Sequence, residues 1–194
     1  QLYVTTKLWN DAHGYEKTLT AFEESRKRLG LGYIDAYLIH WPGFEETYLP
    51  TWKAFEKLYR EGVVRVIGVC NFTRPTLGGL LANCEVKPMI NQIEANFVFQ
   101  PDVNMAYCAQ QGVLVEAWRP LAKGRLDNET IAGIAAKHGK SPAQVALRWL
   151  YQRGARVLPK SVNPARMREN LSIFDFALTG EDVADQLLAK SSFE

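Results

Sequence analysis

Short apolar runs alternate with longer amphipathic stretches along the whole of this chain. The clearest run covers residues 34–42: it is mostly apolar up to Ile39 and is followed by His40, Trp41 and Pro42. Parallel strands that are covered on both faces have this composition, and polar residues gather at their carboxyl ends. We therefore predict a buried parallel strand that brings an imidazole and an indole to one edge of a sheet.

Five further segments share this pattern of an apolar run that ends in polar residues. The first carries Lys7 and Trp9, so a lysine and a second indole are expected at the same edge as His40. The strands are predicted over residues 3–9, 34–40, 64–71, 89–94, 113–118 and 156–161.

The stretches between the predicted strands have apolar residues at helical spacing with polar residues on the other side. Thr73, Ser141 and Asn163 are expected at helix N-termini, and Ser141 is followed by Pro142, a favoured N-cap and N1 pair. Helices are predicted over 15–29, near 52–59, from 73, over 101–111 and 128–138, and from 142, 164 and 180.

This alternation makes six strand–helix units. Right-handed βα repetition gives either an open doubly wound sheet or a closed barrel. Polar residues at each strand end, from Lys7 to Lys160, favour the ring of a (β/α)8 TIM barrel. Such a barrel has eight units and typically about 250 residues. About six of its eight units are therefore expected here, in one incomplete domain over residues 1–194.

Composition excludes several classes of partner. The net charge is +2 and 23% of the residues are charged. These values give no reason to expect nucleic acid or a membrane surface as a partner. No signal peptide opens the chain, and Cys70, Cys84 and Cys108 are odd in number, so reduced thiols in the cytoplasm are expected. Neither these cysteines nor the three scattered histidines have metal-ligand spacing, so no metal site is predicted.

Seven short stretches together resemble the aldo-keto reductase family, in the branch that includes 2,5-diketogluconate reductases and trypanosomatid prostaglandin F synthases. They occur in the order and at the spacing of the family, over essentially the whole chain. The stretches are residues 4–9, 35–42, 67–72, 91–94, 116–121, 158–162 and 170–176.

The resemblance implies NADPH-dependent reduction of aldehydes and ketones by an Asp-Tyr-Lys-His tetrad, in which Lys7 and His40 match the lysine and the histidine. The family's Asp and Tyr belong to a segment that precedes Gln1, so we expect a truncated member without its first two units, roughly 70 residues. A lysine ammonium is a poor proton donor at pH 7. Tyr3 and Tyr37 are expected within strands, and neither is nominated as a substitute for the missing tyrosine, so this chain alone is expected to have impaired turnover.

The resemblance also assigns the nicotinamide end of the cofactor. Asn71 and Gln92 would bind the carboxamide, because an amide side chain supplies both a donor and an acceptor. Cys70 stands where the family has serine, and Trp118 would stack on the nicotinamide ring. Without the resemblance, Trp118 would be interpreted as core, Gln92 as a buried network residue and Cys70 as a small buried residue.

A phosphate-binding segment is expected at residues 160–166. Lys160, Ser161 and Arg166 surround a helix start, whose free N–H groups and positive dipole end favour a phosphate. The fork of Arg166 suits a ribose 2′-phosphate, which favours NADPH over NADH. By resemblance, the cofactor-binding set is Cys70, Asn71, Gln92, Trp118, Arg119, Pro120, Leu121, Lys160, Ser161, Val162, Arg166, Glu169 and Asn170, the last two near the adenine.

Two departures from the family pattern bear on this cofactor set. Arg119 replaces the serine of a Trp/Tyr-Ser-Pro-Leu turn beside the pyrophosphate, where it could add a phosphate contact or crowd the cofactor. Residues 94–97 replace Glu-Leu-His-Pro, so the loop after the fourth strand could follow another path.

Trp9, Trp41 and Phe44 are expected to wall a substrate pocket suited to small or flexible carbonyl compounds. A second hypothesis is a non-catalytic barrel remnant that binds NADPH or is structural. A metal-dependent barrel hydrolase is disfavoured, because no His or carboxylate cluster occurs at the strand ends. A monomer is expected for the full-length protein, whereas six strands alone leave edges open to self-association.

Overall fold

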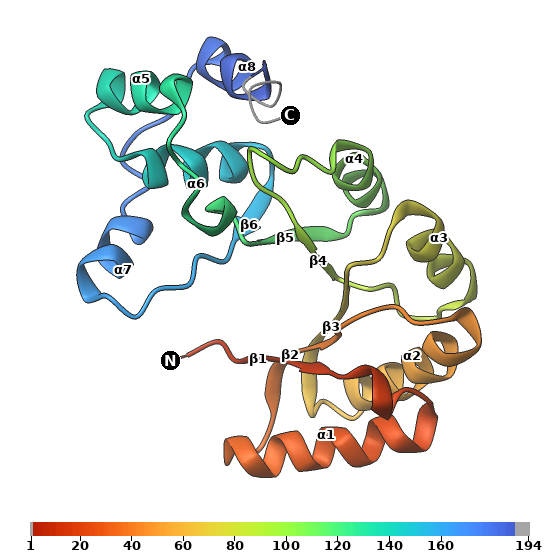
Figure 1. Cartoon of the computed structure of the whole chain (residues 1–194). Coiled ribbons are helices and arrows are strands. Elements are labelled where there is room, and N and C mark those ends of the chain that lie inside the picture. Colours follow the sequence, from red (N-terminus) through yellow and green to blue (C-terminus); the bar gives the residue numbers. More distant parts are fainter. Residues whose placement is uncertain (1, 189–194) are drawn as a thin grey trace. The chain divides into compact units, whose positions relative to one another are not determined.

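The structure is a computed structural model that describes residues 2–188 (Figure 1). Parallel strands alternate with helices along the chain, as the sequence pattern predicts. The strands are β1 (Thr5–Leu8), β2 (Ile34–Ile39), β3 (Val64–Cys70), β4 (Ile90–Glu94), β5 (Leu114–Trp118) and β6 (Ala155–Val157). The α-helices are α1 (Tyr15–Leu29), α2 (Glu45–Arg60), α3 (Arg74–Asn83), α4 (Asp102–Gln111), α5 (Glu129–His138), α6 (Pro142–Gln152), α7 (Pro164–Leu171) and α8 (Gly180–Leu188), with 3₁₀ turns η1 (Asn10–Ala12) and η2 (Ala122–Gly124).

Contacts divide the chain into two compact units. The first unit comprises Gln1–Gln92 and Val103–Leu114, and the second comprises Ile93–Asp102 and Val115–Glu194. The single domain expected over 1–194 stays a prediction, and residues 1 and 189–194 of it lie outside the described residues.

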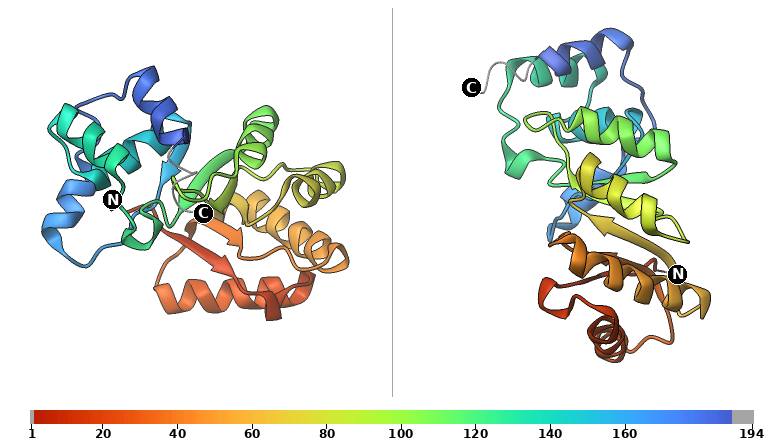
Figure 2. Two further views of the ribbon diagram at one scale, coloured as in Figure 1. Left: turned by 45° about the horizontal axis from the view of Figure 1, so that its top comes forward. Right: turned by 90° about the vertical axis from the view of Figure 1, so that its right-hand side faces the viewer.

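The first unit is a parallel sheet with helices on its outer face. β1 pairs with β2, β2 with β3, and β3 with β4. Tyr37 of β2 stacks on Phe55 of α2 and meets the ring of Phe22 of α1 edge to face, and all three side chains are buried. These aromatic contacts hold α1 and α2 against the strands, and Figure 2 shows both helices running beside them.

The second unit is built around the β5–β6 pair, in which Val115 aligns with Ala155. α6 packs beside β6 and buries Trp149 and Leu150, while α5 lies against α6 and α8. Burial of these large apolar side chains supplies the main stabilisation of this unit.

The predicted elements agree with the structure apart from their ends. β6 stops at Val157, so the expected extension to residue 161 was wrong; Pro159 has no N–H to give to a ladder. β1 begins at Thr5, so Tyr3 precedes the strand rather than lying within it. Thr73 occupies the N-cap of α3, but its side chain makes no capping hydrogen bond and contacts the Thr76 hydroxyl instead.

In the described part of the chain, no helix is both long and apolar enough to cross a membrane.

Candidate functional site

The strand register of the first unit places four predicted site residues on one face of its sheet. Lys7 aligns with Leu38, and His40 lies two residues beyond Leu38 along the chain, so both side chains are on the same face. Cys70 aligns with Gln92 in the β3–β4 pair. Leu38, Cys70 and Ile90 pack together in one buried cluster, which identifies this face as the interior one.

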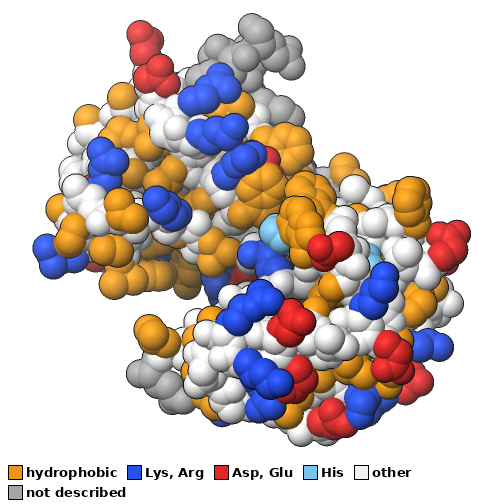
Figure 3. Space-filling view, turned by 60° about the horizontal axis from the view of Figure 1, so that its bottom comes forward, with side chains coloured by type: hydrophobic (Ala, Val, Ile, Leu, Met, Phe, Trp, Pro, Cys, Tyr) orange, Lys and Arg blue, Asp and Glu red, His pale blue; other side chains and the backbone are white. Residues whose placement is uncertain are grey.

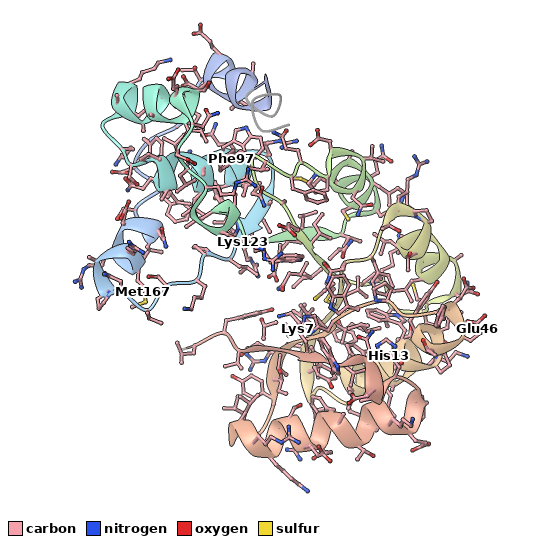
Figure 4. The ribbon with its side chains drawn as sticks, viewed as in Figure 1. Lys7, His13, Glu46, Phe97, Lys123 and Met167 are labelled. Carbon is pink, nitrogen blue, oxygen red and sulfur yellow. The ribbon has the colours of Figure 1, made fainter. Side chains whose placement is uncertain are left out.

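Lys7 and His40 are close enough to interact electrostatically, and Lys7 lies on β1 (Figure 4). Both side chains are half-buried. Burial lowers the pKa of His40 from its ordinary value, and the Lys7 cation lowers it further. The imidazole is therefore neutral near pH 7 and can donate a hydrogen bond from one ring nitrogen.

Aromatic rings flank His40. The Trp9 ring meets the imidazole edge to face with 4.9 Å between ring centres, and the Trp41 ring lies nearly parallel to it at 6.4 Å. Trp9 is 55% exposed and Trp41 is 43% exposed, so both indoles have free surface. Phe44, at the N-terminus of α2, is 77% exposed.

Asn71 connects β3 to His40. Its backbone is left-handed, with φ of 62°. This conformation is uncommon for any residue other than glycine. The Asn71 side-chain Nδ2 donates to the backbone carbonyl of His40 at 3.0 Å. Neighbouring Asn91 bonds the backbone of Phe72 through both amide atoms. Because Asn91 faces away from the interior, Gln92 is the amide on the interior face.

Tyr37 cannot serve as a proton donor beside Lys7. It aligns with Thr6, so its side chain points to the helix-covered face of the sheet, opposite to Lys7. Its hydroxyl is buried without a hydrogen-bond partner in the described part of the chain, and burial raises its pKa.

The second unit contains a pocket of about 680 Å³. Eight of the predicted cofactor residues line it, whereas Val162 is 81% exposed and, like Trp118, is not part of the lining. Four lining residues are cationic and one, Glu169, is acidic, so the pocket suits an anionic ligand. The lining comprises Arg119, Pro120, Leu121, Lys123, Gly124, Leu126, Ser141, Pro142, Ala143, Leu158, Pro159, Lys160, Ser161, Arg166, Glu169 and Asn170.

Sequence reasoning missed Lys123 and the α6 N-terminus as parts of this pocket. Lys123 lies on the η2 turn (Figure 4). Gly124 is a turn signal that could have drawn attention to the segment. The contribution of Ser141 and Pro142 comes only from the folded arrangement of α6.

The N-terminus of α7 differs from the expectation in one respect. The Asn163 carboxamide oxygen accepts from the backbone N–H groups of Ala165 at 2.9 Å and Arg166 at 3.2 Å. Pro164 has no N–H. The expectation of free N–H groups was therefore wrong at these positions. Anion recognition here depends on the Lys160 and Arg166 side chains and on the positive end of the helix dipole.

Asn96 organises the loop after β4, where the sequence departs from the family pattern. Its side-chain oxygen accepts from the N–H groups of Val98 and Phe99, and its Nδ2 donates to the backbone carbonyl of Arg119 at 3.2 Å. This amide therefore links the loop to the turn that carries Arg119.

The turn from Arg119 to Gly124 is strained. Arg119, Ala122 and Lys123 all have left-handed φ values, of 52°, 47° and 60°. Such backbone conformations persist only where the surroundings enforce them, and they cluster at functional sites. The turn lines the pocket and presents two of its four cations.

Positive and negative side chains are interspersed on the face that Figure 3 presents.

Among the described residues, no group of three or more His, Cys, Asp or Glu side chains is arranged to hold a metal ion.

Parallel βα units with polar residues at the strand ends are typical of the α/β barrel class of proteins. The aldo/keto reductase family model matches residues 1–186, and the chain belongs to this family.

Named relatives agree with this assignment. The chain is 49% identical over 187 residues to the 9,11-endoperoxide prostaglandin H2 reductase of Trypanosoma cruzi (strain CL Brener). It is 50% identical over 188 residues to the glyoxal reductase of Bacillus subtilis (strain 168). Each alignment covers 94% of this chain and 66% of the relative, so the chain spans slightly less than two thirds of their length.

Solved structures are similar over the same region. An aldo-keto reductase from a Medee basin deep-sea metagenome library matches with a TM-score of 0.95 and 45% identity, over 100% of this chain and 73% of that chain. An aldo-keto reductase of Bombyx mori, solved in complex with NADP, matches with a TM-score of 0.91 and 38% identity, over 97% of this chain and 67% of that chain. The predicted fold class is thereby confirmed: the six parallel strands of the described residues belong to an aldo-keto reductase barrel.

Proposed function

We propose that this chain is the greater part of an NADPH-dependent carbonyl reductase, and that its own residues bind NADPH. The observation that carries the proposal is the pocket of the second unit, with four cations around a space of about 680 Å³. Family membership supports it, as do the relatives named as reductases and the structure solved with NADP.

In this proposal Arg166 and Lys160 bind the ribose 2′-phosphate, because a guanidinium fork and an ammonium both suit a doubly charged group. Glu169 and Asn170, one helical turn further on, would lie near the adenine. Asn71 and Gln92 would bind the carboxamide, and Trp118 would stack on the nicotinamide ring. When bound, the cofactor supplies a hydride.

His40 would orient the substrate carbonyl. Its lowered pKa supports this role, because a neutral imidazole donates one hydrogen bond to a carbonyl oxygen without adding a charge. Lys7 would lower the pKa of the family's tyrosine hydroxyl, the group that supplies a proton to that oxygen. Trp9, Trp41 and Phe44 would form an aromatic wall for small or flexible aldehydes and ketones, since these side chains keep exposed surface.

A second part of the proposal concerns carbonyl reduction by this chain alone. The family's tetrad uses a tyrosine hydroxyl and an aspartate that match no position in these 194 residues, and Tyr37 is buried on the opposite face from Lys7. We therefore propose that this chain alone binds NADPH but does not reduce carbonyls at an ordinary rate. Consumption of NADPH with a reactive aldehyde at a rate typical of reductases would contradict this. Among the described residues, Cys70, Cys84 and Cys108 form no disulfide, which fits a reducing compartment such as the cytoplasm.

Titration of the chain with NADPH and NADH, followed by tryptophan fluorescence, tests the binding proposal. Arg166→Ala should weaken NADPH by about tenfold or more and leave NADH almost unchanged, because hydrogen bonds to a charged group contribute about 1.5–3 kcal/mol. Arg168→Ala is the matched control: it lies on the same helix but is not part of the pocket lining, and it should change neither affinity. Equal losses for both cofactors, or no loss in Arg166→Ala, would refute the 2′-phosphate assignment.

A further inference from the structure

Arg119 has more than one partner for its guanidinium. Its Nη1 lies 3.4 Å from the Oε2 of Glu94, and its Cζ lies 4.7 Å from the centre of the Trp118 ring. Its backbone is fixed separately, because the carbonyl accepts from the side chain of Asn96 and from the N–H of Ala122. The backbone is thus held in place while the side chain, 47% exposed, has room to change partner.

The Glu94 contact is weak for an ion pair. Charge-assisted N–H···O hydrogen bonds are commonly about 2.7–2.9 Å long. The Arg119–Glu94 distance of 3.4 Å is well beyond that, and both side chains are partly exposed to water. Exposed pairs of this kind contribute little. A stronger anion nearby would therefore displace Glu94 easily.

The position of Arg119 offers such an anion a place to bind. Arg119 and Lys123 belong to the same strained turn, and both line the cationic pocket. The pocket also contains Lys160 and Arg166, to which the proposed function assigns the 2′-phosphate. The other two cations, Arg119 and Lys123, have no assigned ligand group. They match in number the two negative charges on the pyrophosphate of a dinucleotide.

We propose that the Arg119 guanidinium changes partner when the cofactor enters this pocket, and we call this exchange of partners the gate. Glu94 and the Trp118 ring hold the guanidinium in the free protein, and the pyrophosphate of NADP⁺ or NADPH takes it over on binding. Glu94 is then a competitor of the cofactor, acting through Arg119. This inference rests on the proposed function and adds to it a regulatory pair at the same site.

The exchange predicts effects of opposite sign for the two partners. Arg119→Ser removes the pyrophosphate contact and should weaken NADP⁺ about tenfold, the usual effect of losing one hydrogen-bonded charge. Glu94→Gln releases the guanidinium and should tighten NADP⁺. In the double variant the effect of Glu94→Gln should disappear, because the proposed competition requires the Arg119 guanidinium. Glu94 also contacts the side-chain Nδ2 of Asn96 through its Oε1, at 3.5 Å, and an effect transmitted by that contact would persist without Arg119.

Titrations of the whole chain with NADP⁺ and with 2′-AMP test the proposal. 2′-AMP has the 2′-phosphate but no pyrophosphate, so wild type, Arg119→Ser and Glu94→Gln should bind it equally. Arg125→Ser removes a positive charge outside the pocket lining and should bind NADP⁺ like wild type. Circular dichroism of each variant establishes that it is folded, and Arg119→Lys, which keeps the charge without the fork, should be intermediate.

Two results would overturn the gate while leaving the proposed function intact. One is that Arg119→Ser binds NADP⁺ as tightly as wild type or more tightly, which would mean that the arginine is idle or crowds the cofactor. The other is that the effect of Glu94→Gln persists without Arg119. If wild type binds neither NADP⁺ nor 2′-AMP, the proposed function fails, and the gate fails with it.

Discussion

Lys7 influences His40 because of the register between two short strands. β1 aligns Lys7 with Leu38, two residues before the histidine, and strand alternation puts the amine and the imidazole on one face. Burial disfavours the protonated imidazole and lowers the pKa of His40, and the nearby Lys7 cation lowers it further. The result is a histidine that is ready to donate a hydrogen bond without carrying charge.

Replacing the lysine tests this coupling. Lys7→Met removes the cation and should raise the pKa of His40, although burial should still keep it below that of an exposed histidine. The pKa is measured from the pH dependence of the histidine ring signals in NMR spectra, of which the sequence has only three to assign.

Lys17→Met, on the exposed surface of α1, is the matched control and should leave the pKa of His40 unchanged. An unchanged or lower pKa of His40 in Lys7→Met would contradict the close approach of the two side chains.

Some contacts of the site residues could be predicted from the sequence, and others could not. Lys7 and His40 could be paired from the sequence, because strand ends and alternation are visible in the pattern. The sequence does not show whether the Asn163 side chain caps α7, because an asparagine before Pro164 fits either a cap or an open anion site. In the structure it does cap the helix and accepts from two of its N–H groups. The partners of Arg119 depend on a left-handed turn without a glycine at position 119, which no local pattern signals.

At the scale of elements, the helix starts differ in how well they are capped. Ser141 and Gln144 form a capping box at α6: each side chain bonds the backbone N–H of the other residue, at 3.2 and 3.0 Å. Thr73 stands at the same position of α3 but makes no such bond. The sequence carries part of this difference: Ser141 is followed three residues later by Gln144, as a capping box requires, whereas Thr73 is followed by Thr76.

Alanine substitutions should reproduce this difference. Ser141→Ala should lower the free energy of unfolding by about 1 kcal/mol, the usual contribution of an N-cap side chain. Thr73→Ala should cost clearly less, because no capping hydrogen bond is lost. Urea denaturation of both variants measures the two values, and equal losses would show that the capping box contributes nothing specific.

The order and type of the elements could be predicted because apolar runs and helical spacing are local properties of the sequence. The end of β6 could not, because the apolar pattern continues through Leu158 while Pro159 interrupts the ladder. The short η2 turn also escaped prediction, although it supplies Lys123 to the pocket.

At the scale of the whole molecule, one buried carboxylate ties α8 to α5 within the second unit. Asp182 of α8 is 2% exposed and accepts from Lys137 and His138 of α5, each at 2.8 Å, and from the N–H of Thr179 at 2.9 Å. Burial by itself would raise the pKa of Asp182, but the hydrogen bonds from Lys137, His138 and Thr179 outweigh it and hold the pKa far below its ordinary value of 3.8.

Because of this lowered pKa, the free energy of unfolding depends on pH in the acid range. A lowered folded pKa contributes stability that is fully present above the unfolded pKa and is lost as pH falls from about 4 through the folded value. Asp182→Asn should reduce the free energy of unfolding at pH 7 by about 2 kcal/mol, because hydrogen bonds to a charged group are lost. It should also flatten the loss of stability below pH ~4.

The matched control is Asp175→Asn. The exposed carboxylate of Asp175 pairs with Lys140, and its loss should change the free energy of unfolding little. Urea denaturation between about pH 3 and pH 7 measures both variants. An Asp182→Asn protein whose stability follows that of wild type across this range would contradict the role of the buried carboxylate.

The barrel class could be predicted from the whole chain because strand–helix units repeat and each strand ends in polar residues. Comparison with known proteins confirmed the family, which periodicity alone could not name. The division into two compact units was not anticipated, because the sequence contains no linker at which to divide it.

We propose that NADPH binds in the pocket of the second unit, between the Arg119 turn and the start of α7. Hydrogen exchange of the wild-type chain with and without NADPH, read by mass spectrometry of its peptides, tests it most directly. We predict slower exchange in peptides that cover residues 119–124 and 159–170, and unchanged exchange in α1. Exchange that is unaltered in both of those segments at saturating NADPH would contradict binding of the cofactor in this pocket.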